Sequence, residues 1–539
     1  MEKSCDIIWQ MLRSEFFAPV AAILLATFFK ALTWIGVVPI WHTPDEQAHF
    51  ATIQNHAEEV IKPGYTGLTH SEELILSERF LDTERGSKRV NKFTFNPDHR
   101  IEYISGPVGK YEEEIKNLPK NTRTNMLEKE AGSYYPLYYQ IGKIIYQSFY
   151  NFDLFVRVYA VRLFSILPIL GITYFTYLVA KEIFPKEKYL YLVIPVLVSF
   201  QPMVTYISSG VTIDGLNILL FTAFLYFSIL AIKKGLNFKN LIAMSIILGL
   251  GQITRPQFLV NLPLFALIFL YDFIARKRKI VESLTNVLVF ISVMILAGGW
   301  FTLQKTLGNF FQTGVPIPYY ELGQPPTPVD LSLFTHLKNS LIQLDQQNFY
   351  WYWGVFKWLS LVYPAILNQI LKGISLIALI GGVIWFLKIL KNKNFSKETL
   401  AIIFLLIASL FTAFGVFFVD WRHILTNGFS LGVQGRYFLP SVLPHMILAT
   451  IGILALVPEK FAKITAFGLG VGMIVLNTFA LFWVTNSYYY IDRGDLLGQL
   501  SQYKPVLFKS PFLLVYFGLY FASLIFLFWQ LIRVSFSQK

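Results

Sequence analysis

The fold class is decided by residues 256–303, which read PQFLVNLPLFALIFLYDFIARKRKIVESLTNVLVFISVMILAGGWFTL. Two apolar runs, at about 256–273 and 282–303, flank the basic tip Arg276–Lys279. A helix of about 20 apolar residues crosses the hydrocarbon core of a bilayer, and Lys and Arg gather in cytoplasmic loops. This stretch therefore predicts two transmembrane helices joined by a short cytoplasmic tip.

The whole chain has the composition of a membrane protein. Of its 539 residues, 54% are hydrophobic and 15% are charged, and the mean hydropathy is +0.51. A soluble fold has too little interior to hide so much apolar surface. The net charge of +13 comes from basic residues in short tips between apolar runs, which is typical of cytoplasmic loops and not of nucleic-acid binding. The single cysteine, Cys5, excludes an intramolecular disulfide and a thiolate metal cluster.

Apolar runs of spanning length recur along the chain and predict an all-α bundle of about 12 transmembrane helices. With Arg276–Lys279 in the cytoplasm, the other basic tips and both termini also fall inside. The alternation closes if the tyrosine-rich segment at about 134–150 lies along the membrane surface without crossing. The first run is read as a retained anchor, because it is too long for a signal-peptide core. The predicted spans lie at about residues 16–38, 157–180, 189–207, 213–232, 240–254, 256–273, 282–303, 371–390, 399–419, 437–456, 463–485 and 511–532.

Three polar segments are predicted on the extracytoplasmic side of the inner membrane, at about 41–153, 304–352 and 486–510. The acidic clusters Glu72–Glu73 and Glu112–Glu114 in the first of them predict solvated helix faces. The expected domains are an N-terminal seven-helix catalytic membrane module over 1–303 that includes the outer loop 41–156, a second outer loop over 304–352, and C-terminal membrane helices over 353–539.

The most unusual polar motif, Trp41–Phe50, follows directly after the first span and reads WHTPDEQAHF. A proline at a helix start followed by acids in the first turn is favourable capping chemistry, and this accounts for one acid. It does not account for two adjacent carboxylates, Asp45 and Glu46, at a membrane surface. If Asp45 opens a helix, His49 lies four residues on and faces the same way. We therefore expect a carboxylate and an imidazole to share one patch.

Further ionisable residues fall at the same predicted rim of the membrane. Asp214 opens an apolar helix, where capping is the simplest role, although an ionisable group in a membrane helix usually has a partner. Arg255 stands on a tight turn and either snorkels to lipid headgroups or binds a phosphate. Arg422 and Arg436 are cations on the same side, and an ion pair with Asp420 is their structural alternative. The residues expected to bind substrate are His49, Asp214, Arg255, Gln257, Arg422, His423, Gln434, Arg436 and Tyr437.

Three motifs resemble those of a family of predicted bacterial membrane proteins: Pro-Asp-Glu-x-x-His-Phe at 44–50, the Pro, Ser and Asp-Gly positions of 202–215, and Gln-Gly-Arg-Tyr-Phe-Leu-Pro at 434–440. That family is similar in layout to the GT-C glycosyltransferases, which are polytopic enzymes that use polyprenyl-phosphate-linked sugars. They carry an acidic motif in the first outer loop and share a seven-helix module, and seven spans are predicted here before residue 304. The segment Tyr135–Tyr139, with Arg157 and Arg162, is also similar to a stretch common in that superfamily.

The resemblance implies an inverting membrane glycosyltransferase with its active site on the extracytoplasmic face. Asp45 or Glu46 is the expected catalytic base for an acceptor hydroxyl, and Arg255 and Arg436 are expected to hold the donor phosphate. Many GT-C enzymes have a separated pair of acids where this chain has adjacent ones, which leaves metal use open. Asp45, Glu46 and His49 are the candidate ligands for Mg or Mn. The expected partners are a polyprenyl-phosphate-linked sugar, a lipid, glycan or protein acceptor, and membrane lipids.

Two other functional classes fit the composition. A lipid or glycan transporter or flippase is also polytopic, but transporters tend to hold charges near the bilayer midplane and to show paired halves. A non-catalytic envelope assembly subunit would use the long outer loop to bind a partner, and its acidic motif would only cap a helix. Donor consumption that depends on Asp45 or Glu46 separates the enzyme from both.

Overall fold

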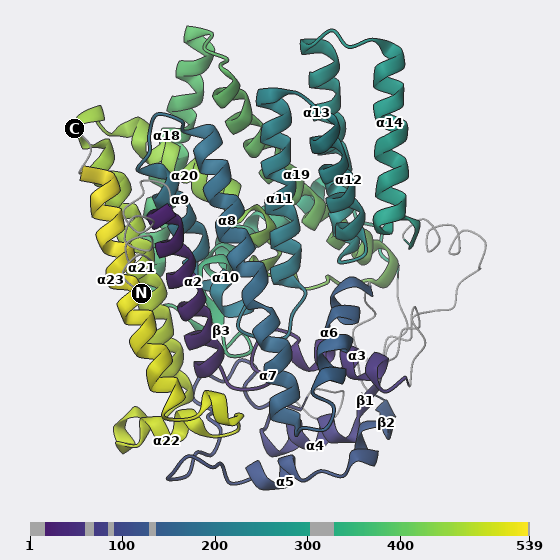
Figure 1. Cartoon of the computed structure of the whole chain (residues 1–539), viewed down its shortest axis with the longest axis vertical. Helices are drawn as coiled ribbons and strands as arrows, with labels where there is room; N and C mark the ends of the chain where they lie inside the picture. Colours follow the sequence, from purple (N-terminus) through teal and green to yellow (C-terminus); the bar gives the residue numbers. More distant parts are fainter. Residues whose placement is uncertain (1–16, 60–68, 85–90, 129–135, 302–327, 537–539) are drawn as a thin grey trace, which may run out of the picture.

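The computed structural model describes residues 17–59, 69–84, 91–128, 136–301 and 328–536. Its long helices run side by side, and short helices gather with a small sheet at one end (Figure 1). Among the described residues, ten helical segments are long and apolar enough to cross a membrane, and two more predicted spans are shorter apolar helices. The predicted all-α polytopic bundle is therefore confirmed, with ten of its twelve predicted spans long enough to cross a membrane.

The ten long segments comprise 15 helices, because five of the segments are formed by two consecutive helices. They are α2 (Phe17–Val37), α7 (Leu154–Phe164) with α8 (Ile166–Ile183), α11 (Asp214–Lys234), η2 (Pro256–Val260) with α13 (Asn261–Ala275), α14 (Ile280–Met294) with η3 (Ile295–Gly299), α18 (Ala365–Asn392), α19 (Lys397–Asn427), η5 (Gly435–Ser441) with α20 (Val442–Leu456), η6 (Glu459–Phe461) with α21 (Ala462–Tyr488), and α23 (Phe512–Phe536). The two shorter helices are α9 (Leu190–Ser199) and α12 (Phe238–Gln252).

The ends of the long helices carry the expected local signals. Helix α11 has Asp214 in its first turn and Lys233 and Lys234 in its last turn, which complements the helix dipole. It ends before Gly235, whose φ of 96° is readily adopted by glycine alone. Helix α19 begins where the Ser396 side chain accepts a hydrogen bond from the amide of Thr399.

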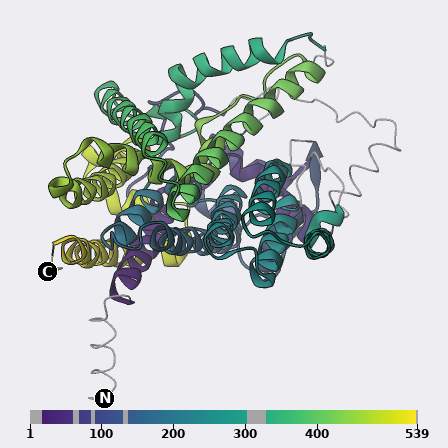
Figure 2. The ribbon, with the colours of Figure 1, turned by 90° about the horizontal axis from the view of Figure 1, so that it is seen from above.

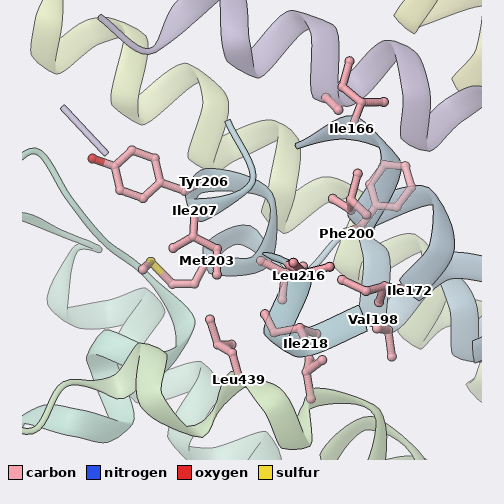
Figure 3. Close-up of a cluster of buried hydrophobic side chains, with 14 of the residues drawn as sticks. Ile166, Ile172, Val198, Phe200, Met203, Tyr206, Ile207, Leu216, Ile218 and Leu439 are labelled. Carbon is pink, nitrogen blue, oxygen red and sulfur yellow. The ribbon is translucent and has the colours of Figure 1, made fainter. Parts of the chain in front are cut away.

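The two ends of the described chain lie side by side, because α2 packs against α23 (Figures 1 and 2). Helices α8, α9 and α11 pack behind α2 and form the centre of the bundle. The short helix α10 (Pro202–Ile207) follows α9 and contributes Met203 and Tyr206 to the apolar core, which Figure 3 shows together with core residues of the neighbouring elements. A buried apolar centre thus adjoins the loops that hold the polar motifs.

The segment between α2 and α7 folds over one end of the bundle, which we call the loop end (Figure 1). Strands β1 and β2 pair antiparallel there, with Thr69 opposite Glu128. Helix α6 has 13 residues and packs against α3 and α7, and a helix of that length is too short to span a bilayer. The elements of this segment are α3 (Glu46–Ala57), β1 (Thr69–Ser71), α4 (Glu72–Phe80), α5 (Glu112–Lys116), η1 (Lys120–Arg123), β2 (Met126–Glu128) and α6 (Pro136–Ser148).

The predicted outer segment at about 486–510 joins the loop end. Gln502 donates hydrogen bonds to the carbonyls of Ile104 and Gly106 at 2.5 and 2.8 Å, and Arg100 donates to the carbonyl of Tyr489 at 3.3 Å. The elements of the second and third predicted outer segments, together with two short strands that follow the second one, are α16 (Leu333–Gln343), η4 (Leu344–Asn348), α17 (Phe349–Trp353), β3 (Val355–Phe356), β4 (Leu361–Val362), η7 (Ile491–Arg493), α22 (Leu496–Ser501) and η8 (Val506–Phe508). Of the predicted loop 304–352, residues 304–327 lie outside the described residues.

The prediction that both acidic clusters form solvated faces is wrong for one member of each. Glu73 is 2% exposed and is paired with Arg157, and Glu112 is fully buried and accepts a hydrogen bond from Lys509 at 2.6 Å. Burying a carboxylate is costly unless it is paired. These two acids therefore tie the loop end to α7 and to the start of α23, which the periodicity of the sequence alone does not reveal.

Candidate functional site

The Asp45 carboxylate stands at the start of α3, just beyond the end of α2. Asp45 is the residue before the helix and has the left-handed values φ 57° and ψ 20°, which are rare for a residue other than glycine. Its carbonyl accepts the first helical hydrogen bond, from the amide of His49 at 3.0 Å. Asp45 and His49 line the same cavity, as the four-residue spacing predicts.

A cavity of about 320 Å³ opens beside these two residues, between α11, η2, α19 and η5. One part of its wall carries the ionisable groups Asp45, His49, Arg255 and Arg436, and the rest is largely apolar. The remaining lining residues are Ile213, Asn217, Phe221, Thr254, Phe258, Val260, Asn261, Thr412, Gly415, Val416, Val419, Leu431, Val433, Tyr437 and Pro440. We call this the large cavity.

Two arginine–carboxylate pairs form the charged part of the site. Arg436 Nη2 lies 2.6 Å from Asp45 Oδ2, and Arg255 Nη2 lies 2.6 Å from Asp214 Oδ1. Arg436 Nη1 is 3.9 Å from Asp214 Oδ2 and so connects the two pairs. Two cations and two anions balance, and the Asp45 side chain remains 32% exposed. The buried Nε of Arg436 has no hydrogen-bond partner within the described ranges, so it is free to donate to a ligand.

His49 contributes a neutral imidazole to the wall of the large cavity. Its Nδ1 lies 2.8 Å from the hydroxyl of Tyr139 on α6. Burial lowers the pKa of His49 to about 4, although the nearby charges of Asp45 and Asp214 act in the opposite direction. At neutral pH the ring is therefore uncharged, with one nitrogen that donates and one that accepts. The link to Tyr139 also explains why the tyrosine-rich segment lies next to the acidic motif.

Glu46 occupies a different environment from its neighbour Asp45. It is fully buried, and Arg162 Nε and Nη2 donate to its two oxygens at 2.7 and 2.6 Å. The amides of Trp41 and Val211 donate to the same oxygens, each at 2.9 Å. Glu46 therefore has no oxygen facing the large cavity, and it joins α3, α7 and the loop before α11. Of the two acids predicted as the base, only Asp45 lines the cavity.

The structure brings some of the other predicted site residues together and separates the rest. Tyr437 lines the large cavity, where its ring centroid lies 5.5 Å from the Arg436 guanidinium carbon. Gln434 lines a second, smaller cavity that also includes Asp45 and Arg436. The side chain of Gln257 lies outside the described residues.

Arg422 and His423 do not reach the site. The expected outer loop at this position is instead helix, because α19 continues to Asn427. Arg422 is exposed, and His423 lies 3.1 Å from the Asn427 side-chain nitrogen. The expected ion pair between Asp420 and an arginine is absent from the described residues, since Asp420 accepts from Ser430 and Leu431 at 2.8 and 2.7 Å.

The three residues considered as metal ligands do not converge. The oxygens of Glu46 are engaged by Arg162 and two backbone amides, and one oxygen of Asp45 faces Arg436. Within the described part of the chain, no group of three or more His, Cys, Asp or Glu side chains is arranged to hold a metal ion. In this arrangement Asp45, Glu46 and His49 do not form a site for a divalent cation.

Sequence reasoning missed several residues of the site. His42 and Trp358 line the smaller cavity, and Thr254 and Asn261 line the large one. His42 belongs to the quoted acidic motif, in the turn between α2 and α3, and its place in that motif was an available signal. Trp358 lies more than 300 positions from Asp45, and only the folded chain brings it there.

The fold and the cavities define a polytopic helical membrane protein with a charged pocket at one end of its bundle. The chain belongs to the family described as "Predicted membrane protein (DUF2142)", whose model matches residues 28–446. A search of curated proteins finds no match.

Solved structures also match the chain at low sequence identity. ArnT from Cupriavidus metallidurans bound to undecaprenyl phosphate matches with a TM-score of 0.40 and 12% identity over 97% of this chain and 78% of that chain. The Archaeoglobus fulgidus oligosaccharyltransferase in the apo form matches with a TM-score of 0.46 and 11% identity over 88% of this chain. The matched part is 57% of that oligosaccharyltransferase chain. These similarities assign no activity to the chain.

Proposed function

We propose that this chain is an inverting GT-C-type glycosyltransferase, which transfers a sugar from a polyprenyl-phosphate donor to an acceptor hydroxyl. The observation that carries the proposal is the large cavity, in which paired arginines and carboxylates adjoin an apolar wall formed by membrane helices. A polyprenyl-phosphate sugar has the same division between an anionic head and an apolar tail. The acidic and Gln-Gly-Arg motifs resemble those of a membrane protein family that is similar in layout to the GT-C glycosyltransferases, which supports the same chemistry.

The donor phosphate is proposed to bind between Arg255 and Arg436. Each guanidinium is held in place by one carboxylate and keeps further N–H groups for a ligand. Because the four charges sum to zero, an incoming phosphate competes with Asp45 and Asp214 for the arginines. The prenyl chain then lies along Phe221, Phe258 and the other apolar residues of the same cavity. The two cations stabilise the charge that develops as the phosphate leaves.

Asp45 is the proposed catalytic base. Its partly exposed carboxylate borders both cavities, so it meets an acceptor hydroxyl and the donor at one point. The acceptor oxygen attacks the anomeric carbon, and the bond from that carbon to the phosphate oxygen breaks. The electron pair leaves with the polyprenyl phosphate, and Asp45 takes the hydroxyl proton. Attack opposite the leaving group inverts the anomeric configuration.

The reaction is proposed to occur on the extracytoplasmic face. Both cavities border Asp45, which lies at the loop end. The basic tip Arg276–Lys279 lies at the opposite end of the bundle (Figure 1), and basic tips favour the cytoplasm. The sugar, the length of the prenyl chain and the acceptor would be identified from the activity itself.

The test is incubation of the detergent-purified chain with a panel of radiolabelled polyprenyl-phosphate sugars. We expect one donor to be consumed, and Asp45→Asn to lower the rate by about 10²–10⁴-fold, as loss of a general base does. Asn keeps the side-chain shape and an oxygen for Arg436. Glu113→Gln is the matched control, because it removes the same charge from an exposed position on α5 and should leave the rate unchanged. A folded protein that consumes no donor in a broad panel, or Asp45→Asn with full activity, would contradict the proposal.

A further inference from the structure

A second cavity of about 180 Å³ adjoins the large cavity, and we call it the small cavity. Asp45 and Arg436 line both cavities, which share no other lining residue. The ion pair is therefore the wall between them. The small cavity is lined by His42, Pro44, Asp45, Thr94, Met203, Tyr206, Val355, Phe356, Trp358, Leu359, Gln434 and Arg436. A ligand there lies beside Asp45, as does a ligand in the large cavity.

The lining of the small cavity favours an uncharged ligand that carries both polar and apolar surfaces. Apart from the Asp45–Arg436 pair, its lining residues have no ionised side chain. Three aromatic side chains, Tyr206, Phe356 and Trp358, stand beside polar groups of His42, Thr94 and Gln434. Aromatic faces attract the C–H hydrogens of a sugar ring, while its hydroxyls need hydrogen-bond partners. An anionic group would find no cation there except the already paired Arg436.

His42 is a polar residue of this lining whose ring nitrogens lack hydrogen-bond partners among the described residues. Its side chain is 1% exposed, and neither ring nitrogen has a hydrogen-bond partner within the described part of the chain. The ring is held edge-to-face by Phe93 and Tyr488, with centroids 4.4 and 4.8 Å away. Burial and the charge of Lys357 lower the pKa of His42 well below its usual value. A neutral imidazole offers one donor and one acceptor, and leaving both unpaired when buried is costly.

The turn that carries Trp358 is strained and is held from several sides. Lys357, Trp358 and Leu359 have φ values of 51°, 54° and 64°, and consecutive left-handed residues without glycine are unfavourable. Trp358 Nε1 donates to the carbonyl of Trp41 at 2.9 Å. The Lys357 ammonium donates to the carbonyls of Pro97 and Ser487 at 2.7 and 2.8 Å. Strain that persists under such constraint is typical of ligand sites.

We propose that the small cavity binds the neutral sugar ring that carries the acceptor hydroxyl, with His42 as its positioning residue and Trp358 as a stacking face. This inference rests on the proposed function, because it places the acceptor across Asp45 from the donor phosphate. If the small cavity binds a neutral sugar ring, the acceptor is a glycan or a glycolipid with an uncharged terminal sugar. An anionic lipid headgroup and a protein side chain fit this lining less well.

The test measures the binding of soluble sugars to the full chain in detergent by saturation-transfer NMR. The probes are methyl glycosides of glucose, galactose, mannose and N-acetylglucosamine, and the anionic comparison is the methyl glycoside of galacturonic acid with its carboxylate free. We expect at least one neutral glycoside to bind and the anionic analogue to bind more weakly. His42→Phe should lower that affinity by at least about tenfold, as the loss of buried hydrogen bonds predicts.

The His42→Phe variant also separates ligand recognition from folding. Phe keeps an aromatic ring against Phe93 and Tyr488 and removes two nitrogens without partners, so the thermal midpoint should not fall. Trp358→Leu gives a second variant that should weaken glycoside binding. The proposal is overturned if no neutral glycoside binds the wild-type protein, or if His42→Phe binds as well as the wild type.

A parallel assay distinguishes this inference from the proposed function. Binding of undecaprenyl phosphate to the same samples is measured by native mass spectrometry. Arg255→Gln should lose the lipid phosphate and keep the glycoside, and His42→Phe should show the reverse. If glycosides bind and undecaprenyl phosphate does not, the proposed donor fails and the sugar site stands. If the lipid binds and no glycoside does, the inference alone fails.

Discussion

At the residue scale, the adjacent acids Asp45 and Glu46 show what a motif can and cannot predict. The sequence predicts two carboxylates at a helix start, and capping explains one of them. The backbone at Asp45 is left-handed, and the Glu46 side chain that follows it points to Arg162 on α7. This local geometry decides that Asp45, and not Glu46, faces a ligand. The partner of Glu46, Arg162, lies 116 positions away along the chain. No local pattern identifies that pair.

This difference predicts opposite phenotypes for the two neutral variants. Glu46→Gln leaves Arg162 buried beside an amide that cannot accept four hydrogen bonds, so we expect it to lower the free energy of unfolding by about 3–5 kcal/mol. Asp45→Asn should have a much smaller effect, because its carboxylate is partly exposed. Equilibrium unfolding in mixed detergent and SDS micelles measures both. A stable Glu46→Gln protein with no transferase activity would instead make Glu46 the base.

At the element scale, the spans could be predicted because each is defined by its own apolar length. The ends of the helices are predicted less accurately than their existence. The predicted span 399–419 is part of α19, which continues through Asp420 and Arg422 to Asn427. That extension removes Arg422 from the site, whereas the following loop returns to place Arg436 opposite Asp45. The sequence shows that Arg422 and Arg436 are charged residues near helix ends. It does not show the path of the chain after α19, and that path decides which of the two arginines reaches Asp45.

The close contact between η5 and α17 positions Arg436 and gives an element-scale prediction. A Cβ at Gly435 would lie 2.2 Å from the Tyr352 nitrogen and 2.6 Å from the Asn348 carbonyl oxygen. These backbone atoms cannot move aside alone, so Gly435→Ala should displace η5 and its arginine. We expect undecaprenyl phosphate affinity to fall at least about tenfold and stability to fall by about 1–3 kcal/mol.

Gly468→Ala is the matched control for this change. Gly468 lies on α21, and a Cβ there would meet nothing within 4 Å. The same substitution at that position should leave lipid binding and the thermal midpoint unchanged or slightly raised. Equal binding by Gly435→Ala and the wild type would show that η5 does not set the position of the arginine.

At the scale of the whole molecule, the site is assembled from segments that are distant in the sequence. Asp45 and Arg436 are separated by 391 positions, and they meet because the central helices α8, α9 and α11 hold the first and last thirds of the chain together. The sequence allowed the site residues to be placed at one rim of the membrane. It did not show that they surround two cavities, since that depends on packing between helices.

The charge distribution predicts the direction of the molecule in the membrane, and this gives the last prediction. Cys5 is the only cysteine, so a Cys5→Ser background allows single cysteines to be placed at either end. Glu113 lies on α5, at the loop end of the molecule. Lys391 lies in the last turn of α18, at the end of the bundle away from the loop end. Both positions are exposed, and each can be changed to cysteine. Because basic tips remain in the cytoplasm, a membrane-impermeant maleimide should label Glu113→Cys in intact cells. It should label Lys391→Cys only after permeabilisation. The reverse pattern would place Asp45 and both cavities on the cytoplasmic face, and the acceptor sugar would then have to be a cytoplasmic one.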